Sequence, residues 1–188
     1  MSFFPAYLSL SNKKILLVGG GYIALEKLEK LIDFSTEIMV ISKELSPEFQ
    51  SFALAHNIHI EQRAYQVGDI NGYDIVIVAT DTAVLHKAIY EESRATRVLV
   101  NSVDNTAYCD FIFPSYIKKG DLTVSVSTSG ASPALAKRLR VYLEKIIPTE
   151  IESFLKEMRN LRKTLPKGKD RMQFFEEKTD RFMAKYFK

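Results

Sequence analysis

The sequence contains one cysteine, Cys109, and three histidines, His56, His59 and His86. A single thiol excludes an internal disulfide and any thiolate cluster for zinc or an iron–sulfur centre. His56 and His59 fall at an exposed helix-to-strand junction and His86 on a surface helix, so we expect no metal site. No Ser/His/Asp or Cys/His arrangement supports hydrolysis, and Cys109 is interpreted as a packed thiol.

Long apolar runs are also missing. No uninterrupted stretch approaches the ~20 residues of a membrane helix, and the first residues lack the basic start and apolar centre of a signal peptide. We therefore expect a cytoplasmic protein that does not bind a membrane. With 188 residues, 46% of them hydrophobic, the chain is long enough for one sizeable core and a small appended unit.

Positive charge is scarce in the first part of the chain. Residues 1–136 carry 11 basic and 15 acidic side chains, whereas residues 137–188 carry 15 and 8, a net charge of +7. Acidic residues are interspersed in this basic tail and no nucleic-acid-binding module is recognisable, so we expect no nucleic-acid partner. Solvated helix faces or a nearby polycarboxylate ligand would account for the charge.

One stretch organises what is present. The apolar run at residues 15–18 ends in three glycines, after which a helical pattern begins. Gly19, Gly21 and Ala24 fill the small-residue positions of G-x-G-x-x-G/A, which permit a tight turn, close approach of a pyrophosphate and close helix packing. The helix N-terminus then offers free N–H groups to the anion.

The surrounding pattern alternates strands and helices. Apolar runs predict strands at residues 37–42, 58–63, 74–79 and 97–101, with helices at 23–34, 47–56 and 82–92 between them. This alternation predicts an α/β fold with a Rossmann-type, doubly wound parallel sheet. A turn at Ser11 and Asn12 precedes the first strand, and Phe3, Phe4, Pro5, Tyr7 and Leu8 before it are interpreted as packing residues.

The pattern changes after Asp110. Residues 111–117 and 122–127 predict two β segments joined by a hairpin turn. Ser132 and Pro133 then start a helix as N-cap and first helical residue, and Pro148 ends it. Two further helical stripes flank a break at residues 166–168.

Two positions after the second strand are candidates for the adenine ribose. An Asp or Glu is typical there, but the sequence has Ser42 and Lys43, with Glu44 next. Ser42 can hydrogen-bond ribose hydroxyls, and Lys43 can tolerate a 2′-phosphate or remain a solvated lysine. The residues alone therefore leave NAD and NADP open.

The carboxyl ends of two later strands supply further candidates. Ala79, Thr80 and Asp81 close one strand, and residues 101–105 follow the next, where ligands lie in open α/β sheets. Asp81 is better interpreted as a helix N-cap than as a ligand. Asp104 would exchange a proton near the nicotinamide end if burial raised its pKa.

Six sequence segments together resemble the precorrin-2 dehydrogenase family, also known as the siroheme synthase amino-terminal family, over nearly the whole chain. These are residues 4–8, residues 18–21 with Ala24 and Lys27, and residues 78–81, 101–104, 109–114 and 126–136. The resemblance implies NAD-dependent oxidation of precorrin-2 to sirohydrochlorin, and in some members insertion of Fe²⁺ as a second substrate. A non-catalytic, dimeric NAD-sensing module is the alternative.

The resemblance also implies a division of the chain into three regions and a role for each candidate residue. It implies an NAD-binding domain at residues 1–113, a dimerisation region at 114–147 that makes a homodimer, and helices at 148–188. Tyr22 and Ile23 would meet the pyrophosphate, Ser42 and Lys43 the adenosine end, and Asp104 would be the base. Ser127, Thr128, Ser129 and Lys137 would hold the carboxylates of the tetrapyrrole. A chain of this length leaves no room for the methyltransferase module that some relatives carry.

Overall fold

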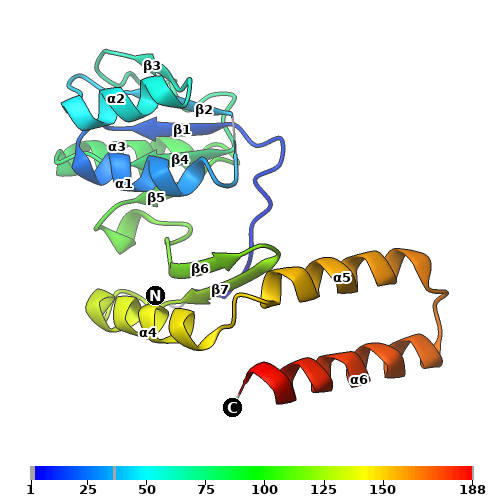
Figure 1. Ribbon diagram of the computed structural model, residues 1–188. Coiled ribbons are helices and arrows are strands. Elements are labelled where there is room, and N and C mark those ends of the chain that lie inside the picture. Colours follow the sequence, from blue (N-terminus) through cyan, green and yellow to red (C-terminus); the bar gives the residue numbers. More distant parts are fainter. Residues whose placement is uncertain (1–2, 36, 188) are drawn as a thin grey trace. The chain divides into compact units, whose positions relative to one another are not determined.

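The computed structural model describes residues 3–35 and 37–187 (Figure 1). The chain divides into two compact units, Met1–Ile112 and Phe113–Lys188. Within the described residues, no helix is both long and apolar enough to cross a membrane.

The first unit is built on a five-stranded parallel sheet with the order β3-β2-β1-β4-β5. The strands are β1 (Ile15–Val18), β2 (Ile38–Ile41), β3 (His59–Glu61), β4 (Ile75–Val78) and β5 (Leu99–Ser102). All four pairings are parallel, which confirms the predicted doubly wound α/β fold. The strand order reverses between β1 and β4, and ligands bind at such a reversal.

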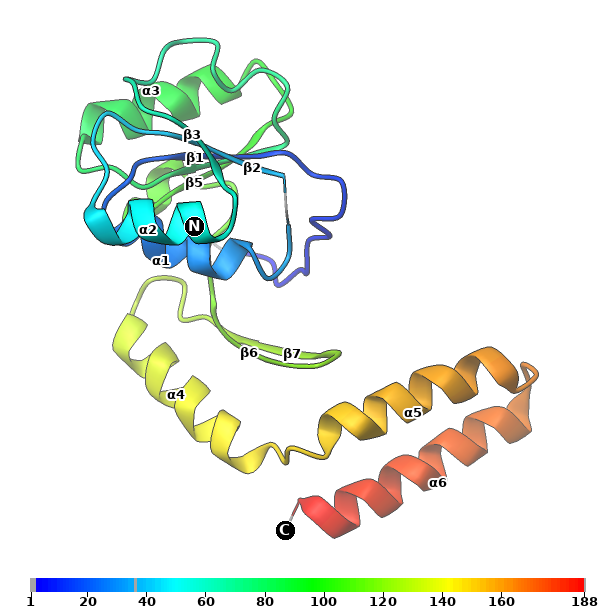
Figure 2. The ribbon, with the colours of Figure 1, turned by 45° about the horizontal axis from the view of Figure 1, so that its top comes forward.

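Helices cover both faces of this sheet. They are α1 (Tyr22–Leu31), α2 (Pro47–Ala55) and α3 (Ala83–Ser93), and a short 3₁₀ helix, η1 (Thr106–Tyr108), follows β5. Figure 2 shows α1 and α2 on one face and α3 on the other. The residues of β1 and β4 are almost wholly buried because both faces of these strands are covered. Each buried aliphatic side chain contributes about 1.5–3 kcal/mol to folding.

The second unit combines a β-hairpin with three helices. Strands β6 (Ser115–Lys119) and β7 (Leu122–Val126) pair antiparallel, as predicted, and Gly120 adopts a positive φ of 56° in the turn. The helices are α4 (Pro133–Ile146), α5 (Ile151–Thr164) and α6 (Lys169–Tyr186). Helices α5 and α6 run antiparallel side by side (Figures 1 and 2), joined by stacked rings of Phe154 and Phe182.

Two sequence-based expectations about local structure are wrong. Residues 111–114 are not part of a strand, because β6 begins only at Ser115. Phe4, Tyr7 and Leu8 were expected to pack, but their exposed fractions are 87%, 71% and 50% in the single chain. An aromatic-rich segment predicts burial without specifying the surface that covers it, and in the described part of this chain that cover is incomplete.

Candidate functional site

The glycine turn after β1 has the geometry of a nucleotide-binding turn. Gly19 adopts a φ of +128°, and a Cβ there would lie 2.1 Å from the Ala79 carbonyl oxygen, so only glycine fits. Gly21 is different, because a Cβ there would meet nothing within 4 Å. This glycine leaves open space directly before α1.

Helix α1 starts at this open space with an uncapped N-terminus. Gly21 is its N-cap residue, no side chain caps the first N–H groups, and the first turn has no acidic residue. The first four N–H groups of a helix have no partner inside it and carry partial positive charge. The turn is therefore suited to a phosphate group, and the residues present fit a bound dinucleotide.

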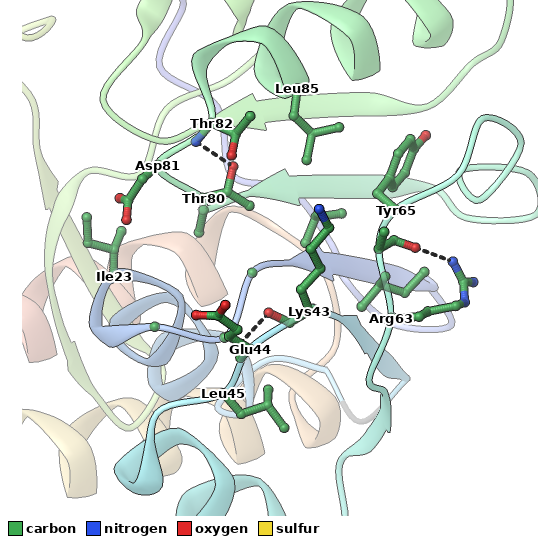
Figure 3. Close-up of a pocket in the computed structure, with 18 of the residues that line it drawn as sticks. Ile23, Lys43, Glu44, Leu45, Arg63, Tyr65, Thr80, Asp81, Thr82 and Leu85 are labelled. Carbon is green, nitrogen blue, oxygen red and sulfur yellow. Dashed lines mark hydrogen bonds between the residues drawn. The ribbon is translucent and has the colours of Figure 1, made fainter.

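A pocket of about 950 Å³ extends from this turn (Figure 3). Its walls come from the carboxyl ends of β1, β2 and β4, from the segment after β3 and from the start of α3. The pocket brings together all nine residues that we predicted for cofactor binding. They are Gly19, Gly21, Tyr22, Ile23, Ser42, Lys43, Ala79, Thr80 and Asp81.

The segment after β2 is fixed against the glycine turn. The Ser42 hydroxyl donates to the Glu44 carbonyl over 2.6 Å, and the Ser46 amide donates to the Gly20 carbonyl over 2.9 Å. A Cβ on Gly20 would lie within 3 Å of Ser42 Oγ, so the two segments are in close contact. The hydroxyl proton of Ser42 is thus committed to its own loop, and Ser42 keeps only acceptor capacity for a ligand.

Sequence reasoning missed the wall that follows β3. Arg63 donates to both carboxylate oxygens of Asp69 over 2.6 and 2.9 Å, to Glu61 over 2.7 Å and to the Ala64 carbonyl over 3.0 Å. Tyr65 donates to Glu92 over 2.7 Å. Because β3 is parallel to β2, its end reaches the same edge of the sheet, and that adjacency was the available signal.

These contacts shift the pKa values of two side chains beside this wall, Asp69 and Tyr65. Hydrogen bonds from Arg63 hold the pKa of Asp69 below its usual value. Burial raises the pKa of the Tyr65 hydroxyl, and the neighbouring Glu92 carboxylate adds to the effect. Asp69 therefore stays ionised and Tyr65 stays neutral at physiological pH.

The end of β4 is held by a histidine that we placed wrongly at the surface. His86 is only 5% exposed, with Nε2 2.8 Å from the Thr80 carbonyl oxygen and Nδ1 2.5 Å from Ser102 Oγ. A carbonyl oxygen only accepts, so Nε2 carries the proton and, in the neutral ring, Nδ1 accepts from the Ser102 hydroxyl. His86 thereby connects the ends of β4 and β5 from the buried side of α3, which it shares with Ile89 and Ser93.

Asp81 does not cap α3. The N-cap residue is Thr82, whose own amide is 3.3 Å from Thr80 Oγ1, and no side chain caps the helix. The capping prediction fails because the helix starts one residue later than an Asp81 cap requires. Asp81 is left exposed at the wall of the pocket.

Asp104 lies outside the residues that line the pocket. It follows β5 in a left-handed conformation with a φ of 62° and is exposed in the single chain, whereas its predicted role assumed burial. The loop around it is fixed by Cys109, whose thiol accepts from the Ser102 amide over 3.2 Å and donates to the Ser102 carbonyl over 3.1 Å. Burial raises the pKa of this thiol, and the expected packed role is confirmed.

The residues predicted for substrate belong to the second unit. Ser127 Oγ accepts from the Ser129 amide over 3.1 Å, and Thr128 Oγ1 accepts from the Ser132 amide over 3.0 Å. Both hydroxyls keep a free proton to donate. Ser132 caps α4 by accepting from the Leu135 amide, as predicted, and Lys137 is exposed in the second turn of that helix.

The reversed strand order, the glycine turn and the adjoining pocket together define a dinucleotide-binding domain of the doubly wound class. Residues 6–115 match the model of a family described as NAD(P)-binding, and the chain belongs to that family. Residues 119–145 match the family described as sirohaem biosynthesis protein, central. The resemblance stated from the sequence is thereby confirmed.

Similar proteins carry the name siroheme synthase. Siroheme synthase 1 of Serratia proteamaculans is 35% identical over 151 residues, which are 80% of this chain and 32% of that protein. The siroheme synthase of Methylococcus capsulatus is 32% identical over 180 residues, 94% of this chain and 38% of that protein. This chain thus spans about a third of the length of these relatives.

A solved structure shares the fold. The protein titled SirC, precorrin-2 dehydrogenase, matches with a TM-score of 0.75 over 90% of this chain and 85% of its own, at 24% identity. This similarity supports the fold of the chain, including the hairpin and helices that follow the sheet.

Proposed function

We propose that the chain is an NAD-dependent dehydrogenase that oxidises precorrin-2 to sirohydrochlorin in sirohaem biosynthesis. The observation that carries the proposal is the succession of two matched regions, an NAD(P)-binding region at residues 6–115 and a sirohaem biosynthesis region at residues 119–145. The names of the relatives and of the solved structure agree with it. The three-part division at residues 113 and 147 belongs to the same proposal.

The residues of the first unit would hold the cofactor. The uncapped start of α1 binds the pyrophosphate, Gly21 lets it approach, and the segment after β2 meets the adenosine end. NAD supplies the hydride acceptor when bound. Thr80 and Asp81, at the carboxyl end of β4, border the same pocket near the point where the strand order reverses.

Asp104 would take the proton that leaves the substrate when its hydride is transferred. Its carboxylate projects from a loop that Cys109 and His86 fix through Ser102, so the loop is held although Asp104 itself is exposed. An aspartate tolerates a left-handed backbone at moderate cost. A bound tetrapyrrole would exclude water from this carboxylate and place it within reach of the proton that leaves.

The second unit would bind the acidic substrate. Ser127, Thr128 and Ser129 precede the N-terminus of α4, a position that favours carboxylates, and Lys137 adds a positive charge one turn further. Ser129 adopts a φ of 51°, which is uncommon for a serine. A strained residue directly after two hydroxyl residues that accept hydrogen bonds within the loop is consistent with a shaped binding loop.

A homodimer is part of the proposal. Four apolar side chains at helical spacing on α4 have exposed fractions of 40–61%; they are Leu135, Leu139, Tyr142 and Ile146. Among the described residues, the sheet of this unit consists of β6 and β7, so each strand leaves one edge without a strand partner. A second copy of the chain would cover both features.

Leu139→Glu should shift the protein from dimer to monomer in sedimentation experiments. A wild type that is monomeric at micromolar concentration would contradict the dimer.

Anaerobic turnover tests the activity. Purified protein is mixed with enzymatically made precorrin-2 and NAD, and NADH formation is followed together with the absorption of sirohydrochlorin. We expect equal amounts of both products, with loss of both in Asp104→Ala. A parallel sample with Fe²⁺ tests metal insertion. NAD binding without turnover would reject the dehydrogenase and support a non-catalytic NAD-sensing module.

A further inference from the structure

We infer that the pocket also accepts dinucleotides with a 2′-phosphate on the adenine ribose, and that Lys43 determines this specificity. The inference rests on the proposed dinucleotide site and concerns only its adenosine end. NAD-selective sites in this fold place an acidic side chain after the second strand, where it binds the 2′-hydroxyl and repels a 2′-phosphate. Sites that accept the phosphate place a cation nearby.

The residue that follows β2 directly is buried. Ser42 is only 9% exposed, and its hydroxyl proton is committed to the Glu44 carbonyl. Its single buried oxygen is therefore not equivalent to the missing carboxylate, whose two oxygens accept from both ribose hydroxyls. The first exposed side chain after β2 is Lys43.

One of the two cationic side chains at the pocket is available to a 2′-phosphate. Lys43 and Arg63 are the two cationic residues that line the pocket among the residues described. The guanidinium of Arg63 is occupied by Asp69, Glu61 and the Ala64 carbonyl, and its donors point away from the pocket in Figure 3. Across the described ranges, no carboxylate lies within ion-pair distance of Lys43. Its ammonium is the available cation.

The side chains of Lys43 and Glu44 point in different directions. Figure 3 shows the Lys43 ammonium extending into the pocket toward Leu85 and Tyr65. Glu44, the next residue, lies on the side of Leu45 and the glycine turn. The acidic side chain of this segment is therefore separated from the lysine, and the two do not neutralise each other through a direct contact.

Binding experiments without tetrapyrrole test this inference. Dissociation constants for NAD and NADP are measured by calorimetry on the wild-type chain, Lys43→Ala and Lys43→Glu. Lys87→Ala is the matched control, because Lys87 is also an exposed lysine of the same unit but does not line the pocket. Adenosine 2′,5′-bisphosphate and ADP serve as probes of the adenosine end alone.

We expect the wild type to bind NADP within about tenfold of NAD. An ion-paired hydrogen bond is worth about one to two powers of ten in affinity, so Lys43→Ala should raise the NADP to NAD ratio of dissociation constants by about tenfold or more. Lys43→Glu should raise it further, and Lys87→Ala should leave it unchanged. Added salt should weaken the binding of NADP more than the binding of NAD, because the contact between Lys43 and the 2′-phosphate is exposed.

Three results would overturn the inference. The first is a wild type that binds NADP more than about a hundredfold more weakly than NAD. The second is a Lys43→Ala variant whose affinities for NAD and NADP fall equally. The third is a control variant, Lys87→Ala, that changes the ratio of the two dissociation constants as Lys43→Ala does. In each case NAD binding and precorrin-2 oxidation remain separately measurable. Failure to bind either dinucleotide would instead reject the proposed cofactor site itself.

Discussion

Replacing Gly21 with alanine should weaken dinucleotide binding while leaving the fold nearly intact. Its backbone, with φ −89° and ψ −169°, is extended and open to any residue, and a Cβ there would touch nothing within 4 Å. The loss in stability should be limited to the difference between glycine and alanine as N-cap residues, which is about 0.5–1 kcal/mol. Any larger effect on binding must come from the ligand.

The expected loss in affinity follows from the hydrogen bonds at the start of α1. A methyl group in the open space would hold a pyrophosphate away from the N–H groups of Tyr22 and Ile23. Loss of one charge-assisted hydrogen bond costs about 1.5–3 kcal/mol, so the dissociation constant for NAD should rise by roughly 10- to 100-fold. Calorimetric titration measures the affinity and thermal unfolding measures the stability.

Gly19→Ala is the informative contrast. Its Cβ would lie 2.1 Å from the Ala79 carbonyl oxygen at a φ of +128°, so the free energy of unfolding should fall by at least about 3 kcal/mol. Unaltered NAD affinity in Gly21→Ala would refute our assignment of the space before α1 to the pyrophosphate. Equal destabilisation by the two substitutions would refute the turn geometry.

Three further predictions concern the groups around the pocket. His86→Ala removes both hydrogen bonds between the ends of β4 and β5 and should cost about 2–4 kcal/mol in denaturant unfolding, with His86→Gln recovering part of the loss. Cys109 should react with iodoacetamide at pH 8 only upon unfolding, because burial raises its thiol pKa; rapid reaction in the native state would contradict this. Because the pKa of Asp69 is lowered in the folded protein, the ionised carboxylate stabilises the fold at pH values above its unfolded pKa of about 4. This contribution is lost as the pH falls through the pKa of the folded protein. Asp69→Asn should therefore flatten the fall in stability between about pH 5 and pH 3, measured by urea midpoints.

The sheet and the glycine turn could be predicted because they depend on local sequence. The apolar runs of β1 and β4 are buried on both faces, so their composition alone indicates parallel strands. Gly19 and Gly21 occupy fixed positions of a known turn, and their two different environments follow from that turn. Ser132 and Pro133 likewise specify the start of α4 by local chemistry.

Contacts of single side chains in irregular segments could not be predicted in this way. His86 was placed at the surface because α3 was interpreted as a surface helix, but its position is decided by Thr80 and Ser102. The wall formed by Arg63 and Asp69 depends on a six-residue loop closing on itself. Neither contact produces a periodic pattern in the sequence, since each involves single residues in irregular segments.

The same distinction explains why two adjacent residues after β2 have different roles. Both Ser42 and Lys43 were candidates for the adenosine end because both follow the second strand, Ser42 for the ribose hydroxyls and Lys43 for a 2′-phosphate. In the fold, the close contact of Gly20 with Ser42 directs the hydroxyl inward to the Glu44 carbonyl. The next side chain, Lys43, lies in the bend that follows β2 and extends into the pocket. The glycine turn therefore determines which residue reaches the ribose, and a substitution at Gly20 should alter dinucleotide specificity as well as affinity.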